Sequence, residues 1–470
     1  MKKTKIVCTM GPQENDIDLL SRMIEAGMDV ARFNFSHGTH EEQAERMESV
    51  RKARERTGRP IAMLLDTKGP EIRTGLLVDH KKVTLEAGKE IILTTEDIDG
   101  TAEKVSITYK KLYEDVKAGD TILVDDGLME LRVKEIDGED IICEIINGGE
   151  LSERKGCNVP GVRTQLPAIT EKDIEDIVWG IGQGFDVIAA SFIRDAAGVY
   201  QIKDLLKEHG STIPVFSKIE CSEAVDNIDE IIEASDGIMV ARGDLGVEVP
   251  FTELPAIQKY LITKCRMLGK RVITATEMLE SMITNPRPTR AEISDVANAV
   301  YDGTSAIMLS GESAAGKYPV DAVRVMGEIA EETERHIDYT HLFQTQSFAI
   351  HNRVDAISHA ACTMAIDLDA KAIVVTSISG LTVRMVSRFR SPITILGLAT
   401  GERAWYKLAL SWGVLPLLTE QFPSMDVLNY FALKEAKRIL NLNEGDTVVM
   451  TGGNTSGQSG NTNVIRIETV

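Results

Sequence analysis

Short apolar runs that alternate with amphipathic helical stretches are the feature that most constrains the fold of this chain. Helical patterns such as residues 16–27 and 252–269 separate most of these runs. The runs number eight and lie at residues 5–10, 30–36, 61–67, 186–193, 214–220, 237–244, 271–278 and 305–312. Eight β–α units in series indicate a TIM (β/α)8 barrel, a fold that typically takes about 250 residues.

One connection in this pattern is far longer than the others. About 120 residues separate the third run from the fourth, and short alternating strands with turn signals replace the helical pattern there. A structureless loop of that length is uncommon inside a compact domain. We therefore expect a small inserted β-domain over residues 70–166. Because it follows a barrel strand, it would lie over the catalytic face, where it can act as a lid.

A second α/β pattern follows a polar stretch at residues 341–355. Its expected strands lie near residues 371–376, 393–398, 414–418, 446–451 and 463–468. Strands and helices that alternate over about 125 residues predict a doubly wound sheet. We therefore expect a barrel domain formed by residues 1–69 and 167–342, and a C-terminal α/β domain formed by residues 343–470.

The charge and cysteine content narrow the classes of partner. The formal net charge of -20 argues against nucleic acid and anionic membranes as partners, because both require basic surface. The 6 cysteines form no C-x-x-C pair, and scattered thiols are typical of a reducing cytosol. Apolar stretches stay well below the roughly 18 residues of a membrane helix. We expect a cytoplasmic protein.

Polar side chains collect where two predicted strands of residues 215–250 end. Lys218 and Glu220 point to one side, because side chains alternate along a strand. Gly243 and Asp244 end the second strand, after an acidic helix. Parallel neighbouring strands would bring the lysine and both carboxylates together, as a Mg²⁺ site for a phosphorylated substrate requires. A structural ion pair between Lys218 and Glu220 is the simpler alternative.

The other strand ends carry polar residues as well. Polar side chains that face into a barrel are costly unless something uses them. Acidic and basic groups together favour an anionic substrate held by cations and a bound metal. The residues are Arg32, Asn34, Ser36 and His37 after the second run, Asp66, Thr67, Glu71 and Arg73 after the third, Arg242 after the sixth, Thr274, Thr276 and Glu277 after the seventh, and Ser310 and Glu312 after the eighth.

With these residues in place, the chain resembles the pyruvate kinase family over essentially its whole length. The matching motifs, in family order, are TKIVCTMGP, ARFNFSHG, LLDTKGPEIRTG, KGCNVPGV, FSKIE, GIMVARGDLGVE, NPRPTRAE and IMLSGESAAGKYP. The resemblance implies a TIM barrel, an inserted β-barrel lid, a C-terminal α/β effector domain and a homotetramer. The implied reaction is phosphoryl transfer from phosphoenolpyruvate to ADP, which gives pyruvate and ATP.

The resemblance also assigns roles to the residues that match the substrate site. Arg32 would hold the phosphoryl group of phosphoenolpyruvate, and Lys218 would stabilise its charge during transfer. The backbone amides of Gly243 and Asp244, together with the Thr276 hydroxyl, would bind the substrate carboxylate.

Two cations are implied as cofactors, and further residues would contact the nucleotide. Glu220 and Asp244 would ligate Mg²⁺ (or Mn²⁺). Thr276 and Ser310 are the candidates for the relay that gives a proton to the enolate. The K⁺ ligands would be Asn34, Ser36, Asp66 and Thr67. The residues near the nucleotide would be Asn34, His37, Arg73 and Lys155.

Three positions carry family-specific information. A glutamate at position 71 accompanies K⁺ dependence in this family, whereas a lysine there accompanies K⁺ independence, so Glu71 predicts K⁺ activation. Glu277 stands where the family pattern leads us to expect glutamine, and Ser305 stands where we expect aspartate. Both departures put local hydrogen bonding in question, not the reaction.

A Ser/Thr-rich loop in the C-terminal domain resembles the family's sugar-phosphate effector loop. It follows an expected strand and opens a helix, as phosphate-binding loops do. Its candidate effector residues are Thr376, Ser377, Ser379, Gly380 and Thr382. The later loop at residues 451–463 lacks the arginine that holds the second phosphate in members that respond to fructose 1,6-bisphosphate. AMP or a sugar monophosphate is therefore an equal candidate, and a helix cap without a ligand is the alternative.

Two other functions are alternatives to this one. A metal-dependent C–C lyase or mutase acting on phosphoenolpyruvate or pyruvate can share a barrel and a carboxylate pair, but Arg73, Lys155 and the inserted lid argue against it. A catalytically inactive metabolite sensor would have lost Lys218, Arg32 or a metal ligand, and all of these are present.

Overall fold

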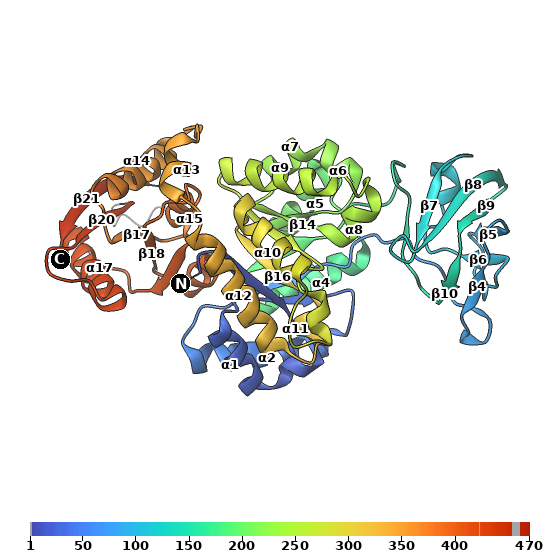
Figure 1. Cartoon of the computed structure of the whole chain (residues 1–470), viewed down its shortest axis with the longest axis horizontal. Coiled ribbons are helices and arrows are strands. Elements are labelled where there is room, and N and C mark those ends of the chain that lie inside the picture. Colours follow the sequence, from blue (N-terminus) through green and yellow to red (C-terminus); the bar gives the residue numbers. More distant parts are fainter. Residues whose placement is uncertain (1, 423, 454–460) are drawn as a thin grey trace.

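The computed structural model describes residues 2–422, 424–453 and 461–470. They form three bodies in a row (Figure 1). The barrel lies in the middle, the inserted strand-rich domain on one side and the C-terminal α/β domain on the other.

Eight parallel strands close into a barrel in the order β1-β16-β15-β14-β13-β12-β3-β2. The predicted TIM barrel is therefore confirmed, and each of the eight apolar runs contains one strand. The strands are β1 (Lys5–Thr9), β2 (Val30–Asn34), β3 (Ala62–Asp66), β12 (Val187–Ala190), β13 (Val215–Ile219), β14 (Gly237–Ala241), β15 (Arg271–Ala275) and β16 (Ala306–Leu309).

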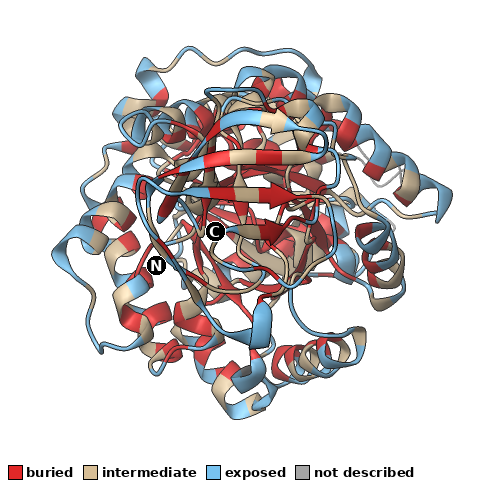
Figure 2. Cartoon of the chain, turned by 90° about the vertical axis from the view of Figure 1, so that its right-hand side faces the viewer, coloured by how far each residue is buried: buried red, intermediate tan, exposed pale blue. Residues whose placement is uncertain are grey.

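Helices surround the barrel and bury their apolar faces against the outward side chains of the strands, such as Phe33 and Ile219. In Figure 2 the buried residues of these helices turn inward and the exposed ones outward. The helices are α1 (Ile17–Ala26), α2 (His40–Thr57), α4 (Glu171–Gln183), α5 (Ala196–Glu208), α6 (Ser222–Asp226), α7 (Ile228–Ala234), α8 (Arg242–Glu248), α9 (Leu254–Met267), α10 (Arg290–Asp302), α11 (Gly311–Ala314) and α12 (Pro319–Arg335), with 3-10 turns η1 (Pro12–Asn15) and η3 (Glu280–Ile283).

Two details of residues 215–250 differ from the prediction. The acidic helix is two helices, α6 and α7, which meet at Asn227. The side chain of Asn227 leaves the helical path and donates to the carbonyl of Arg194 at 2.9 Å. The second strand stops at Ala241, so Gly243 lies in the first turn of α8 and not on a strand.

The inserted domain has its own apolar core, built from residues between Ile72 and Leu166. Its strands form a six-stranded sheet and a two-stranded sheet. The chain enters it at Gly69, whose φ of 74° suits glycine and whose Cα faces Ser191 so closely that a Cβ would lie 2.7 Å from the serine Cβ. The elements are η2 (Val78–His80), β4 (Val83–Leu85), β5 (Glu90–Thr94), β6 (Lys104–Ser106), α3 (Leu112–Asp115), β7 (Thr121–Val124), β8 (Met129–Asp137), β9 (Asp140–Asn147), β10 (Gly149–Leu151) and β11 (Cys157–Asn158).

The C-terminal domain is a five-stranded sheet of order β19-β18-β17-β20-β21, with only β21 antiparallel. Helices α14, α15 and α16 pack on one face and α17 on the other, as a doubly wound sheet requires. The elements are α14 (Arg353–Asp367), β17 (Ala372–Ser377), α15 (Leu381–Ser387), β18 (Thr394–Ala399), α16 (Glu402–Leu408), β19 (Val414–Leu418), α17 (Met425–Leu440), β20 (Thr447–Gly453) and β21 (Thr462–Thr469).

The expected polar connection before this domain is partly helical. Helix α13 (Tyr339–Thr345) buries Phe343, which stacks on His359 of α14 at 5.0 Å between ring centroids. The connection therefore belongs to the core of the C-terminal domain and is not a free linker.

The C-terminal domain covers the N-terminal end of the barrel, opposite the lid. Ala409 and Leu410 join the apolar cluster inside the barrel. From the other side, Lys5 at the start of β1 donates to the carbonyl of Val414 at 2.9 Å, and the amide of Gly413 donates to the carbonyl of Lys3 at 2.9 Å. The first residues of the chain thus hold the barrel and the C-terminal domain together.

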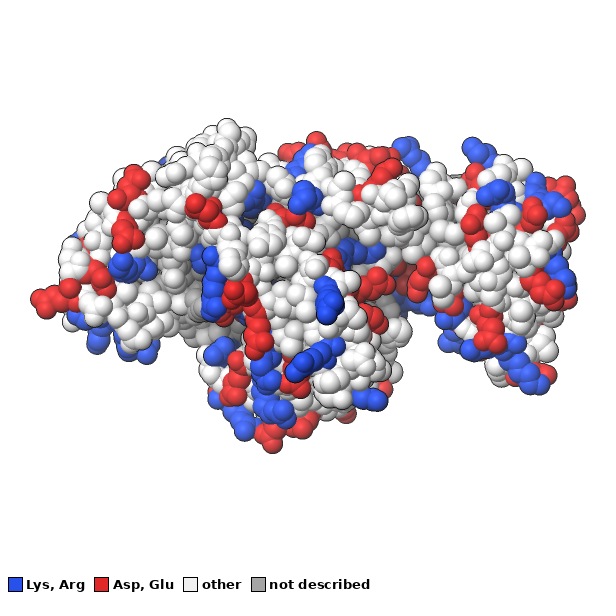
Figure 3. Space-filling view, viewed as in Figure 1, with Lys and Arg blue, Asp and Glu red and all other residues white. Residues whose placement is uncertain are grey.

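Charges of both signs are interspersed on the face of the molecule in Figure 3. All six cysteines are free thiols, as their scattered positions predict. Across the described residues, every helix is either too short or too polar to cross a bilayer.

Candidate active site

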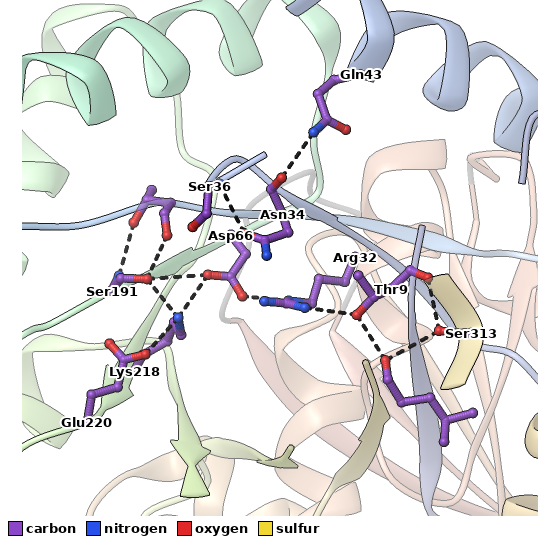
Figure 4. A network of polar contacts seen from close by, with 12 residues as sticks. Thr9, Arg32, Asn34, Ser36, Gln43, Asp66, Ser191, Lys218, Glu220 and Ser313 are labelled. Atoms are coloured by element: carbon purple, nitrogen blue, oxygen red, sulfur yellow. Dashed lines mark hydrogen bonds and ion pairs between the residues drawn. The ribbon is translucent and has the colours of Figure 1, made fainter. Parts of the chain in front are cut away.

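A buried lysine forms the centre of the polar network at the carboxyl ends of the barrel strands (Figure 4). The Nζ atom of Lys218 lies 2.7 Å from Glu220 Oε1 and 3.2 Å from Asp66 Oδ1, and it donates to Ser191 Oγ at 2.7 Å. Lys218 is 9% exposed, and the two carboxylate residues are 0–1% exposed. The ion pair that was the simpler alternative exists, but it belongs to a larger charged cluster.

Arg32 at the end of β2 is the second cation of this cluster. Its Nε donates to Asp66 Oδ2 at 2.6 Å, and its Nη1 donates to Thr9 Oγ1 at 2.9 Å. Asp66 therefore links both cations through its two oxygens. This arrangement fixes Lys218 and Arg32 side by side at the barrel mouth, as the binding of a dianionic group requires.

Burial and charge act in opposite directions on these groups. Burial alone would raise the pKa of Asp66, but Arg32 and Lys218 together hold it below its usual value. Burial would lower the pKa of Lys218, but Asp66 and Glu220 raise it, so the amine stays charged. Burial raises the pKa of Glu220 to about 7, because Lys218 offsets only part of the cost and the Asp244 carboxylate adds to it.

Glu220 keeps one oxygen available for a further partner. Its Oε2 accepts the amide of Phe192 at 2.5 Å, a contact that the positive φ of Phe192 (53°) makes possible. Its Oε1 is buried and accepts no hydrogen bond from any described residue, although Lys218 Nζ lies close by. A buried carboxylate oxygen in that state suits a metal ligand.

The four predicted K⁺ ligands lie on adjacent elements. The register places Asn34 of β2 beside Asp66 of β3. Asn34 Oδ1 accepts the amide of Ser36 at 3.1 Å, and Thr67 Oγ1 accepts the amide of Ser191 at 3.0 Å. The structure brings their oxygens into one region (Figure 4), although both oxygens of Asp66 already contact cations.

Thr276, after β15, has an unusual backbone. Its φ is 67°, which is rare for a β-branched residue, and Glu277 follows with a φ of 53°. The Thr276 hydroxyl accepts the Gly243 amide at 2.8 Å and donates to the carbonyl of Ala275 at 2.7 Å. The predicted carboxylate-binding groups, Gly243 and Thr276, are therefore bonded to each other.

Ser310, after β16, has a buried hydroxyl without a hydrogen-bond partner among the described residues. Its amide donates to Glu312 Oε2 at 2.7 Å, and Glu312 also accepts the amide of Leu279 at 3.0 Å. Burial raises the pKa of Glu312. This carboxyl group connects the loops that follow β15 and β16, and it leaves the Ser310 hydroxyl available for a proton relay.

A cavity of about 260 Å³ lies between the barrel and the lid. The barrel contributes Asp244, whose pKa burial raises, and the lid contributes Arg73 and Lys155. Arg73 Nε donates to Glu71 Oε2 at 2.7 Å, and Lys155 pairs with Asp125 at 2.8 Å. His37, also predicted near the nucleotide, is exposed and lies outside this lining.

Sequence reasoning missed Ser191, which contacts Lys218, Thr67 and Asp66 at the end of β12. It lies at a strand end like the residues that were collected, so its position was a usable signal. It also missed Asp125 of the lid, because the lid strands were not aligned with the barrel.

Comparison with known proteins now bears on this site. The family model described as "Pyruvate kinase, barrel domain" matches residues 1–323, and the model described as "Pyruvate kinase, alpha/beta domain" matches residues 355–468. The chain belongs to the pyruvate kinase family. The resemblance drawn from its motifs, and the prediction that it is an enzyme of this family, are confirmed.

Similar proteins in this family come from several sources. A pyruvate kinase of Geobacillus stearothermophilus is 48% identical over 100% of this chain and 80% of its own length, and one of Staphylococcus aureus is 47% identical over 100% and 81%. A crystal structure of a pyruvate kinase from Cryptosporidium parvum covers 100% of this chain and 96% of its own, with a TM-score of 0.94 at 38% identity.

The two departures from the expected pyruvate kinase pattern lie far apart. Ser305 precedes β16 at the closed end of the barrel, where its hydroxyl accepts Arg390 at 3.1 Å and the amide of Val272 at 3.2 Å. It therefore contributes to the contact with the C-terminal domain. Glu277 is exposed beside Thr276.

The Ser/Thr-rich loop of this pyruvate kinase family member is only partly open. The Gly380 amide donates to Ser377 Oγ at 3.1 Å, and Thr376 and Ser377 are half-buried at the end of β17. Thr382 is buried, and its hydroxyl is bonded to that of Thr462 at 2.6 Å. Thr382 therefore faces β21 and not the loop surface. Residues 454–460 of the second loop lie outside the described part of the chain.

Proposed function

We propose that this chain transfers the phosphoryl group of phosphoenolpyruvate to ADP, giving pyruvate and ATP in the final step of glycolysis, with Mg²⁺ (or Mn²⁺) and K⁺ as cofactors. The observation that carries the proposal is the Lys218 amine, buried and charged between Asp66 and Glu220 and next to Arg32. Family membership supports the choice of reaction.

In this proposal the two cations divide the work on the phosphoryl group. Arg32 binds the phosphate of phosphoenolpyruvate, and Lys218 offsets the charge on its oxygens as it moves to ADP. Both are held in place before the substrate arrives, so little reorganisation is needed. The substrate carboxylate binds at Gly243, Asp244 and Thr276, after the Gly243 amide exchanges its bond with the Thr276 hydroxyl for the ligand.

Glu220 and Asp244 fit a divalent cation. Glu220 Oε1 lacks a hydrogen-bond partner among the described residues, and burial raises the pKa of both carboxyl groups. The described part of the chain places no group of three or more His, Cys, Asp or Glu side chains for a metal. Mg²⁺ is often held by one or two carboxylates plus substrate oxygens. When bound, the ion would neutralise phosphoryl charge and orient the substrate.

The remaining polar residues of the cleft complete the proposed site. Asn34, Ser36, Asp66 and Thr67 supply oxygen donors for K⁺, and Asn34, His37, Arg73 and Lys155 would contact the nucleotide. For the last step, the hydroxyls of Thr276 and Ser310 can pass a proton to the enolate. The unpartnered Ser310 hydroxyl supports its place in this relay among the described residues.

Regulation and assembly are part of the same proposal. A phosphorylated metabolite such as AMP or a sugar phosphate would bind at Thr376, Ser377, Ser379 and Gly380, and the chain would form a homotetramer. Family membership supports both. Light scattering on the purified chain measures the assembly state, and a monomer would contradict it.

The reaction is tested by a lactate dehydrogenase-coupled assay with phosphoenolpyruvate, ADP, Mg²⁺ and K⁺. Pyruvate should form only when ADP is present. Pyruvate release without ADP would indicate a lyase or phosphatase, and no pyruvate would contradict the proposed kinase reaction.

Replacing Glu71 with lysine is expected to reduce K⁺ activation by about fivefold or more, the lower end of usual coupling between two ligands. Glu71 adds negative charge near Asp244, which a bound cation offsets. A lysine side chain at this position would supply a fixed positive charge in place of the bound ion. Activity is measured in K⁺ and in tetramethylammonium. Glu86→Lys, an exposed lid residue, is the matched control, and an unchanged response in Glu71→Lys would refute the charge argument.

The affinity for divalent cations should depend on pH near neutrality. Glu220 has a pKa raised to about 7, so it is a carboxylate above that pH and takes up a proton below it. A metal must displace that proton, so the dissociation constant for Mn²⁺ should rise by about tenfold per unit below pH 7. Mn²⁺ titration followed by electron paramagnetic resonance measures this, and a constant value from pH 6 to 8 would argue against Glu220 as a ligand.

A further inference from the structure

A second cavity, of about 290 Å³, lies between the closed end of the barrel and the C-terminal domain. Its barrel wall includes Pro214, Asp236 and Arg271, which lie at or just before the first residues of β13, β14 and β15. Its other wall includes Arg384 of α15 and Lys407 of α16. This cavity is at the opposite end of the barrel from the lid and the Lys218 cluster.

Positive charge exceeds negative charge around this cavity. Arg271, Arg384 and Lys407 line it, against the single carboxylate of Asp236. That carboxylate already has partners, since it pairs with Lys203 at 3.2 Å and accepts the amide of Val215 at 3.1 Å. A concentration of cations is notable in a chain whose net charge is -20.

Several donors around the cavity lack partners among the described residues. They are Nε of Arg271, Nε of Arg384 and the hydroxyl of Ser411. Arg271 is 8% exposed and Ser411 1% exposed, so water cannot easily compensate them. Burial, with a smaller contribution from the nearby Arg384 charge, lowers the pKa of Arg271 to about 9. Buried donors and uncompensated cations of this kind are what an anion would satisfy.

We propose that this cavity binds the phosphate group of a small phosphorylated metabolite or inorganic phosphate. Guanidinium groups match phosphate geometry, and a lysine ammonium adds a point charge. The volume is at the lower end of the range for small-molecule sites, so it leaves room for a modest organic group but not for a dinucleotide.

The position of the cavity gives its ligand a route to the active site. β13, β14 and β15 begin at the cavity, and their other ends lead to Lys218, Gly243 and Thr276. An anion bound between Arg271 and Arg384 would contact the barrel and the C-terminal domain at once. It would therefore favour the docked arrangement of the two domains. Binding at this cavity does not require the proposed phosphoryl transfer.

Isothermal titration calorimetry with inorganic phosphate, at constant ionic strength, tests the site. The background is the full chain carrying Arg32→Met and Arg73→Met, which removes two phosphate-binding candidates of the active cleft. In this background we expect one binding event per chain. Adding Arg384→Gln or Lys407→Gln should weaken it at least tenfold, whereas Arg438→Gln on the exposed side of α17 should change it less than twofold.

The outcomes separate the possibilities. Loss of all binding in the background, or full binding after Arg384→Gln and Lys407→Gln, would overturn the proposal. Weakening by Ser377→Ala alone would place the phosphate in the Ser/Thr-rich loop and also overturn it. Ser411→Ala removes one hydroxyl and should weaken binding several-fold, so the test remains available if an arginine variant fails to fold. Tighter binding of glucose 6-phosphate, ribose 5-phosphate or AMP than of phosphate identifies an ester as the ligand, and equal binding identifies free phosphate.

Discussion

Replacing Lys218 with methionine is expected to lower turnover by about a thousandfold, the usual effect of removing a preorganised charge from a phosphoryl-transfer site. The amine is held by Asp66, Glu220 and Ser191, so its position does not depend on the substrate. The coupled pyruvate assay measures the loss. Lys134→Met, which removes an exposed lysine of the lid, is the control. Turnover within tenfold of wild type would refute the role of Lys218.

The same substitution should also affect folding. Without the lysine, Glu220 stays buried with no opposite charge beside it, which typically costs about 3–5 kcal/mol of unfolding free energy. Mg²⁺ should restore part of this loss if Glu220 is a ligand. Urea denaturation with and without Mg²⁺ measures both effects. Equal losses in the two conditions would argue against metal binding at Glu220.

Replacing Glu220 with glutamine is expected to have the next largest effect. The shape of the side chain is kept, but the charge that would hold the divalent cation is lost, and such an ion contributes several kcal/mol to the transition state. We expect turnover to fall about a thousandfold and Mn²⁺ binding to weaken about a hundredfold. Electron paramagnetic resonance and the coupled assay measure the two losses.

Glu233→Gln, at an exposed position of α7, is the matched control for this variant. Lys218 would keep its contact with Asp66 in Glu220→Gln, so the lysine should stay charged and in place. A variant that loses turnover but binds Mn²⁺ like the wild type would contradict the assignment of Glu220 as a ligand.

The barrel could be predicted because its signal is repeated. Buried parallel strands need continuous apolar runs, and the amphipathic helices between them have a different period, so one chain shows the same unit eight times. The C-terminal sheet was predicted for the same reason. The side-chain alternation that placed Lys218 beside Glu220 needs only a short regular strand.

The strand ends could not be predicted as well, since the chain leaves regular structure there. Phe192, Thr276 and Glu277 take positive φ values that their residue types do not favour. Tertiary contacts impose these conformations; the bond from the Gly243 amide to the Thr276 hydroxyl is one example. Ser191 was missed because its contacts depend on β12 lying between β3 and β13, which only the closed sheet shows.

The role of Thr382 illustrates a limit of motif reasoning. Its position after Gly380 suggested a phosphate contact, but a partner 80 residues later in the chain takes its hydroxyl. A short local pattern does not reveal such a long-range bond.

The attachment of the first strand has a consequence for synthesis on the ribosome. β1 pairs with β16 through Cys8 and Leu309, and Lys5 bonds to Val414, so neither partner exists when β1 leaves the exit tunnel. At about 5–20 residues per second, the roughly 400 intervening residues take on the order of 20–80 s to make. During that time an apolar strand has one edge without its final neighbour. Nascent chains of this protein should therefore depend on chaperones until the last domain emerges.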